Sequence, residues 1–157
     1  MNQKNDAMTS TANREIVISR VINAPRELVF KAWTDPQQVA KWWGPKGFTN
    51  TIHEMDVKPG GIWRFVMHGP DGVDYNNKIV FIEIVPPARL VYSHGGDDER
   101  ESEQFHVTVS FDKQGSKTAL TMRSLFPSVE KCEQIKQFAI EGGNSSLDCL
   151  EEYLATM

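Results

Sequence analysis

The stretch PSVEKCEQIKQFAIEGGNSSLDCLEEYLA, residues 127–155, decides the fold, because it predicts one long amphipathic helix at the C-terminal end of the chain. Pro127-Ser128 is typical of a helix start. At 100° per residue its apolar side chains gather on one face and its acidic side chains on the other. The apolar face comprises Ile135, Phe138, Ala139, Leu150 and Tyr153. Nothing but a sheet is large enough to cover that face.

The residues before this helix supply such a sheet. Their alternation and turn signals, such as Gly69-Pro70-Asp71-Gly72, predict seven strands, and hairpin-length loops after the second strand favour an antiparallel meander. The expected strands are 14–22, 49–57, 62–68, 74–85, 89–94, 103–111 and 117–125. Two short helices are expected after the first strand, one with Pro25 in its first position and one capped by Asp35 with Gln38 three residues on. The predicted class is α+β, with a curved sheet that grips the terminal helix.

Length, charge and hydrophobicity limit the classes of protein to which the chain can belong. With 157 residues, the chain fits one domain, expected at 14–157, behind a polar tail at 1–13 that is expected to be disordered. A net charge of −4 argues against nucleic acid as a partner. No apolar run approaches the ~20 residues that span a bilayer, so no membrane insertion is expected. The polar start lacks a signal peptide, and a cytoplasmic location follows by default.

Side-chain alternation along the strands predicts which residues face the helix. In 62–68, Trp63, Phe65 and Met67 share one side, while Arg64 and His68 share the other. In 74–85 we prefer Val80 and Ile82 as the inward pair over Ile79 and Phe81, because Glu83 has the parity of the second pair. The candidate cavity lining is Trp43, His53, Met55, Trp63, Phe65, Met67, Val80, Ile82, Tyr92, Val107, Val109, Leu120, Met122, Phe138, Gly142 and Ser146. The alternative is that these side chains form a closed core.

A cavity requires something that holds the helix away from the sheet. Gly142, Gly143 and Ser146 project from the middle of the helix, and two successive glycines inside a helix cost about 1 kcal/mol each relative to alanine. One interpretation is a gap that a ligand fills. The other is a kink, or a point where helix and sheet approach closely. The sequence leaves both open.

No catalytic or metal-binding motif is visible. His53, His68, His94 and His106 lie on four different expected strands, without the spacing of a metal site. The chain has no nucleophile elbow, phosphate loop or dinucleotide fingerprint, so we predict no catalytic residue, metal or cofactor. Of the four histidines, His53, which shares parity with Met55, is the one placed at the cavity wall.

Several strings, in this order, resemble one known family. They are INAPRELVFKAWTDPQQVAKWWGPKGF (22–48), DVKPGGIWRFVMHGPDG (56–72), IVPPARLVYS (84–93), VTVSFD (107–112) and TALTMRSLF (118–126). The family is that of homologues of the C-terminal domain of the activator of the heat-shock protein 90 ATPase, within the START-like (SRPBCC) helix-grip superfamily. The resemblance covers residues 14 to about 154 and implies the helix-grip fold.

The resemblance leaves function open, because superfamily members bind lipids, sterols or polyketides, and some are cyclases or hydrolases. Our leading hypothesis is a binding protein for a small hydrophobic or amphipathic molecule. The second is a contact with a chaperone. The namesake also relies on a separate N-terminal domain where this chain has 13 residues, so strong activation is not expected. The third is a cyclase- or hydrolase-like enzyme that uses a polar cavity residue such as His53. A homodimer is left open.

Overall fold

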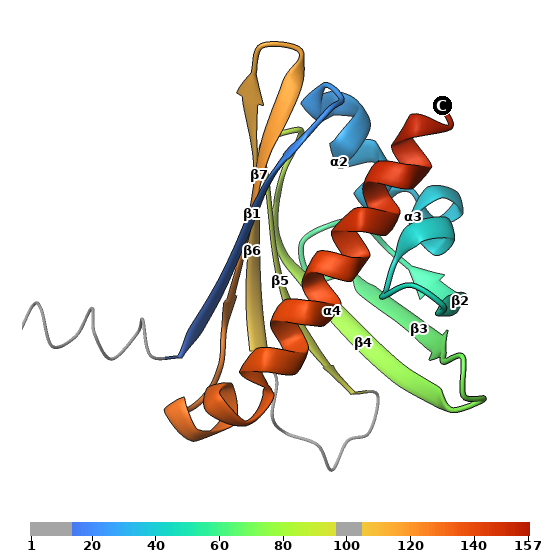
Figure 1. The fold of residues 1–157 in the computed structure, drawn as a ribbon, viewed down its shortest axis with the longest axis vertical. Coiled ribbons are helices and arrows are strands. Elements are labelled where there is room, and N and C mark those ends of the chain that lie inside the picture. The colour runs from blue at the N-terminus through green and yellow to red at the C-terminus, as the bar shows by residue number, and fades with distance from the viewer. Residues whose placement is uncertain (1–13, 97–104) are drawn as a thin grey trace, which may run out of the picture.

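The structure is a computed structural model that describes residues 14–96 and 105–157. The tail expected at 1–13 and the acidic run at 97–103 lie outside the described residues. The elements, in chain order (Figure 1), are β1 (Glu15–Ile22), α2 (Arg26–Thr34), α3 (Pro36–Trp42), β2 (Thr49–Met55), β3 (Ile62–His68), β4 (Asp74–Val85), β5 (Arg89–Gly96), β6 (Phe105–Gln114), β7 (Lys117–Leu125) and α4 (Val129–Ala155).

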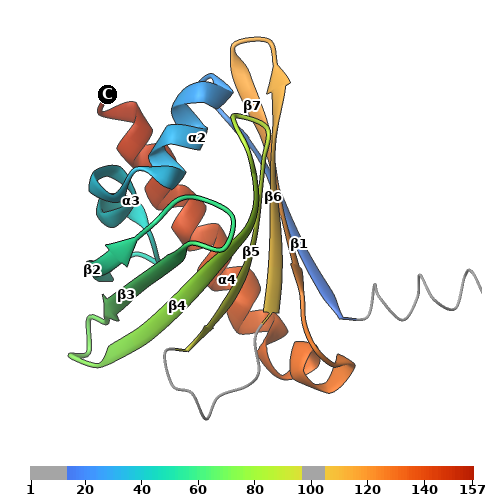
Figure 2. The same cartoon turned by 180° about the vertical axis from the view of Figure 1, so that it is seen from behind.

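The sheet has the strand order β1-β7-β6-β5-β4-β3-β2, and every neighbouring pair is antiparallel. Strands β2 to β7 form a meander, and the first strand closes the far edge beside the last. The two short helices therefore carry the chain from one edge of the sheet to the other. α4 runs diagonally across one face of the sheet, which bends around it (Figures 1 and 2). The predicted α+β helix-grip class is confirmed.

Local capping sets the helix starts. The Asp35 carboxylate accepts a hydrogen bond from the Gln37 amide at 3.0 Å, and the Ser128 hydroxyl accepts one from the Lys131 amide at 3.1 Å. Each satisfies an amide that has no partner within its own helix. Pro25 is the residue before α2 rather than the first residue within it, because its ψ of 150° is still extended.

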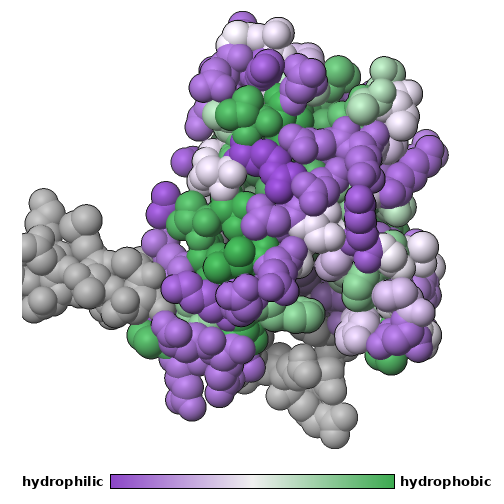
Figure 3. Space-filling view, viewed as in Figure 1, coloured by the Kyte–Doolittle hydropathy of each residue, from purple (hydrophilic) through white to green (hydrophobic). Residues whose placement is uncertain are grey.

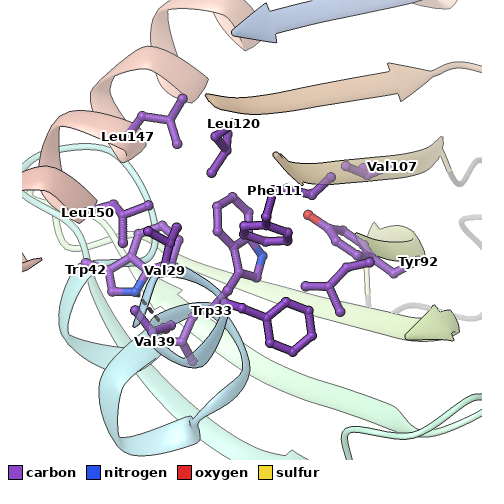
Figure 4. Packing of buried hydrophobic residues seen from close by; sticks show 14 of the residues in the cluster. Val29, Trp33, Val39, Trp42, Tyr92, Val107, Phe111, Leu120, Leu147 and Leu150 are labelled. Atoms are coloured by element: carbon purple, nitrogen blue, oxygen red, sulfur yellow. Dashed lines mark hydrogen bonds between the residues drawn. The ribbon is translucent and has the colours of Figure 1, made fainter. Parts of the chain in front are cut away.

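Two hydrophobic clusters flank the middle of α4. The larger joins α2, α3 and the sheet to the C-terminal part of α4, where Leu147 and Leu150 are buried (Figure 4). Its centre is aromatic: the Trp33 ring lies 5.0 Å from Trp42 and 5.7 Å from Phe111, edge to face. The smaller consists of Ile16, Phe126 and Cys132, under the first turns of α4. Side chains therefore fill the space between α4 and the sheet near both ends of the helix.

The inward pair predicted for β4 is wrong. Ile79 and Phe81 are buried at 0% and 1% exposure, whereas Ile82 is 49% exposed and Val80 is partly exposed. A β-bulge lies between Phe81 and Glu83. A bulge inserts one residue into a strand and reverses the parity beyond it. Glu83, which forms an ion pair with Arg89, therefore gives no information on the side that Phe81 faces.

A second bulge, in β2, makes the placement of His53 wrong as well. Ile52 pairs with Phe65 and Glu54 pairs with Arg64, so His53 is the extra residue between them. Its side chain is exposed, while Ile52 and Met55, three positions apart, both pack against the larger cluster. The alternation rule, carried across the bulge, had put His53 on the same side as Met55.

Candidate ligand-binding cavity

A cavity of about 1030 Å³ lies between the sheet and α4, in the space between the two hydrophobic clusters. Its inner end is formed by the aromatic side chains of α2 and α3, including Trp33 and Trp42. At the other end it is lined by residues 74–77 at the start of β4, by Gly95, and by residues after β7. In Figure 1 these segments lie in the lower part of the molecule, with the start of β4 at the lower right and the first turn of α4 at the lower left.

Eight of the sixteen predicted residues line this cavity. They are Trp43, Met67, Tyr92, Val107, Met122, Phe138, Gly142 and Ser146. They come from α4, β3, β5, β6, β7 and the residue after α3, so the fold brings together side chains that are far apart in the sequence. Phe138 is 78% exposed and therefore lines the cavity from its rim rather than from its floor.

The other eight predicted residues lie elsewhere. Trp63, Phe65, Val109 and Leu120 face inward as expected, but they are buried within the larger cluster. The Trp63 ring packs 4.8 Å from Trp43 and 4.7 Å from Phe65, so aromatic contact closes the space there. Met55 packs against the same cluster from its edge. His53, Val80 and Ile82 are the misplaced residues described above.

Sequence reasoning missed several lining residues, among them Trp33, His94 and Phe105. His94 had a usable signal, because it is two residues after Tyr92 on the same strand and so shares its face. Trp33 lies on the apolar side of α2, and no local pattern distinguishes a core tryptophan from one at a cavity wall. Phe105 is the first residue of β6, and it directly follows residues 97–104, which the structure does not describe.

The two glycines of α4 have different roles. A Cβ at Gly143 would overlap Cδ1 of Ile18, so here the helix approaches β1 closely. A Cβ at Gly142 would meet only Cγ of Pro45, at 3.8 Å, and Gly142 borders the cavity. The close approach is therefore found at Gly143, whereas Gly142 has open space beside it and the ligand expected there stays a prediction. Ser146 donates its hydroxyl proton to the Gly142 carbonyl at 3.0 Å, within the helix.

Polar contacts outside the cavity hold α4 in place. Arg20 of β1 donates to Asp148 at 2.6 Å and to the Asn144 carbonyl at 3.3 Å. The Lys46 amide, in the loop after α3, donates to the Ser145 hydroxyl at 2.9 Å. These contacts attach residues 144–148 of α4 to β1 and to the loop before β2, so this part of the helix is held by polar contacts as well as by apolar packing.

Two polar side chains of β5, the buried Tyr92 and the partly buried His94, line the cavity in neutral form. Burial raises the pKa of the Tyr92 hydroxyl well above its usual range, which the nearby Trp33 indole opposes only in part. Burial lowers the pKa of His94 to about 4. Its ring lies against Phe105 and Phe65, with centroids 5.0 and 6.1 Å away. The Asn77 amide donates to the Tyr75 carbonyl, which leaves the Asn77 oxygen to accept from His94 Nε2 at 3.0 Å.

Comparison with known proteins places the fold in a family. The sequence model of the family described as Activator of Hsp90 ATPase homolog 1-like protein matches residues 23–155. The chain belongs to this family. The match spans both short helices, six of the seven strands and α4, and therefore every element that carries the cavity apart from β1. No curated protein sequence matches the chain significantly.

Solved structures share the family fold. A protein from Arthrobacter aurescens is 25% identical with a TM-score of 0.85, covering 94% of this chain and 89% of its own. A protein from Chromobacterium violaceum is 25% identical with a TM-score of 0.74, covering 88% and 95%. The AHSA1 protein from Silicibacter pomeroyi, at 22% identity and a TM-score of 0.74, covers 90% and 98%. These likenesses establish the helix-grip architecture of this family member.

Within residues 14–96 and 105–157, no cluster of three or more His, Cys, Asp or Glu side chains is arranged to hold a metal ion. In the same part of the chain, no helix combines the length and the hydrophobicity that crossing a bilayer requires. Among the described residues that line the cavity, Asp74 and Lys131 are the two that carry a formal charge near neutral pH, and both belong to the end away from the tryptophans. The family member thus presents a cavity with an apolar inner end.

The low pKa of His94 predicts a pH-dependent stability. In the unfolded chain this imidazole takes up a proton below pH ~6.5, whereas in the native state it stays neutral until about pH 4. The unfolded state therefore binds more protons between these values, and stability falls as the pH is lowered through this window. We expect His94 to contribute about 2 kcal/mol of this loss. Urea unfolding at several pH values, compared with His94→Gln, measures it. An unchanged pH slope in the variant would contradict the assignment.

Proposed function

We propose that this protein binds a small, mainly apolar molecule in the cavity between its sheet and α4. The observation that carries the proposal is the cavity itself: about 1030 Å³ of space is left between two closed clusters, at the top of the size range typical of ligand sites. An unfilled space of this size deprives its lining of packing contacts, which an apolar ligand would restore. A hydrophobic area flanked by hydrophilic side chains also lies beside the middle of α4 (Figure 3).

The cavity favours an uncharged ligand body. Tyr92 and His94 are neutral at physiological pH, because burial penalises the charged form of each. An ion at the inner end would lose its hydration without gaining a counter-charge from the described lining residues. A charged group on the ligand is tolerated only at the other end, where Asp74 and Lys131 lie. The ligand class is thus apolar, or amphipathic with its polar group at the rim.

Filling the cavity from the helix tests this proposal. N-phenyl-1-naphthylamine is a neutral probe whose fluorescence rises in apolar surroundings, and we expect it to bind the native protein. Gly142→Leu places a branched side chain at a position where the backbone has room for a Cβ. We expect the probe Kd to rise at least about tenfold. Helical stability should not fall, because leucine is the better helix former by about 1 kcal/mol.

The matched control is Gly142→Ala, which adds only the Cβ, at ordinary contact distance from Pro45. It should bind the probe with nearly the wild-type Kd. If both variants and the wild type bind the probe equally at equal stability, this part of the helix does not border the binding site. If the native wild type does not bind the probe, and the signal appears only on unfolding, the proposed function itself is wrong.

A contact with an Hsp90-class chaperone is the second candidate, and the family description is the observation that favours it. Steady-state ATP turnover by the cognate chaperone, with and without a saturating amount of this protein, tests it. The cyclase- or hydrolase-like alternative loses the residue suggested for it, since His53 is exposed outside the cavity. A cytoplasmic location and a homodimer stay predictions from the sequence.

A further inference from the structure

Three polar side chains form a hydrogen-bonded chain on the outer face of the sheet. Thr51 of β2, His68 of β3 and Asp74 of β4 come from three neighbouring strands. In β3, His68 has the opposite parity to the buried Trp63 and Phe65, so its side chain faces away from α4. Neither Thr51 nor His68 lines the cavity. The group is therefore a separate feature of the molecule.

Both nitrogens of the His68 ring have a partner. Nδ1 lies 2.7 Å from Oδ1 of Asp74, and Nε2 lies 2.7 Å from the hydroxyl oxygen of Thr51. A carboxylate only accepts hydrogen bonds, so Asp74 fixes a proton on Nδ1. In the neutral ring, Nε2 then has the lone pair and accepts the hydroxyl proton of Thr51. Both distances lie within the ~2.6–3.2 Å over which a base takes up a proton.

A hydroxyl, a base and a carboxylate that orients the base, in this order, are the groups that activate a nucleophile. We propose that Thr51 is a nucleophile that accepts acyl groups, with His68 as its general base and Asp74 as a positioning residue. Stability alone gives little reason for the arrangement. His68 and Asp74 have 37% and 60% of their side-chain surface exposed, and ion pairs at the surface contribute little to folding.

The position of the group favours small acyl donors. β2 is the edge strand, so within the described sheet no further strand lies beyond Thr51. Val66, directly opposite Thr51 on β3, is partly exposed and offers an apolar contact for a short acyl chain. Water rather than a buried donor surrounds the leaving group there, which favours one that departs as an anion. The expected substrates are short-chain thioesters and aryl esters.

The reaction is hydrolysis in two steps. First, the Thr51 oxygen bonds to the acyl carbon, its proton moves to Nε2 of His68, and the thiolate or phenolate leaves with the electron pair of the broken bond. The Asp74 carboxylate stabilises the imidazolium, which then releases the proton to solvent. Second, a water oxygen attacks the acyl carbon and gives a proton to Nε2. The Thr51 oxygen leaves, takes up that proton, and a carboxylic acid is released.

p-Nitrophenyl acetate tests this proposal. A positioned base typically contributes about 10²–10⁴-fold, so the native wild type should release p-nitrophenolate at least about tenfold faster than Thr51→Val and His68→Gln. Mass spectrometry of peptides after a short reaction should find an acetyl group on Thr51. All of these side chains are at least partly exposed, so the urea midpoints of the variants should stay at the wild-type value.

Two substitutions are matched controls. Thr49 is exposed on the same strand and lies directly opposite His68, but the hydroxyl that pairs with Nε2 is that of Thr51. His106 is an exposed histidine of β6. Thr49→Val and His106→Gln should keep the wild-type rate. Acetylation of lysines is common to all variants and cancels in the comparison.

The role of Asp74 has a spectroscopic signature. In ¹⁵N spectra of the wild type, neutral His68 should carry its proton on Nδ1. Asp74→Asn should lose this tautomer preference and lower the acylation rate without raising KM, whereas a carboxylate that only supports the strand pairing would leave the tautomer unchanged. A neutral wild-type ring with its proton on Nε2 would contradict the assignment of the base.

Other outcomes decide against the nucleophile. Equal rates for the wild type and Thr51→Val overturn the proposal, and so does acetylation of His68 or of lysines while Thr51 stays unmodified. Equal losses in Thr49→Val and Thr51→Val overturn it as well. Thr51→Val should bind N-phenyl-1-naphthylamine with the wild-type Kd, because Thr51 lies outside the cavity. Failure of the acyl site therefore leaves ligand binding in the cavity standing.

Discussion

Replacing Ile79 with lysine is expected to abolish the native fold, whereas the same replacement at Ile82 should leave it intact. Ile79 is fully buried, between Trp63 and His94 on the neighbouring strands. A lysine there would bury a charge without a partner, which costs several kcal/mol even after the surroundings relax. Natural domains have only about 5–15 kcal/mol of stability, so Ile79→Lys is expected to lose most or all of it.

Ile82 is the matched control, because it lies three residues further along the same strand with half of its surface exposed. Ile82→Lys should change the free energy of unfolding by no more than about 1 kcal/mol. Circular dichroism and urea unfolding of the two variants measure the difference. The reverse result, with Ile82→Lys unfolded and Ile79→Lys native, would restore the face assignment that strict alternation predicts and would remove the bulge from β4.

Truncation of two α4 side chains should separate stability from binding. Leu150 is fully buried against the aromatic cluster (Figure 4) and does not line the cavity. Leu150→Ala should lower the free energy of unfolding by about 3–5 kcal/mol, from lost apolar burial and the void left behind. Phe138 is mostly exposed at the cavity rim. Phe138→Ala should leave stability within about 0.5 kcal/mol and weaken binding of the apolar probe.

Both variants are compared with the wild type by urea unfolding and by titration with N-phenyl-1-naphthylamine. The fraction of Leu150→Ala that remains folded should bind the probe with nearly the wild-type Kd. A large loss of stability in Phe138→Ala would show that this ring is part of the core in solution. An unchanged probe Kd in the same variant would exclude the rim from the binding site.

Local sequence patterns determined the elements of this protein. Helix periodicity predicted α4 to within two residues, and turn signals marked β3, β4 and β7 at their observed bounds. Asp35 was correctly identified as a helix cap. These features depend on interactions between residues a few positions apart, which a pattern in the sequence records directly. The sequence strings that resemble the activator family implied the helix-grip arrangement. The family match over residues 23–155 supports this expectation.

Tertiary structure alone decided which residues face the cavity. The bulges at Ile82 and His53 reverse the inward–outward alternation of side chains in two strands. No residue type in either strand indicates where these bulges lie. Trp63 and Phe65 face inward as alternation requires, yet their contacts with Trp43 and each other close the space in front of them. Trp33 and Tyr92 are 59 residues apart in the sequence and come together only because α2 packs against the sheet. Alternation records the direction of a side chain, whereas a cavity depends on what packs opposite it.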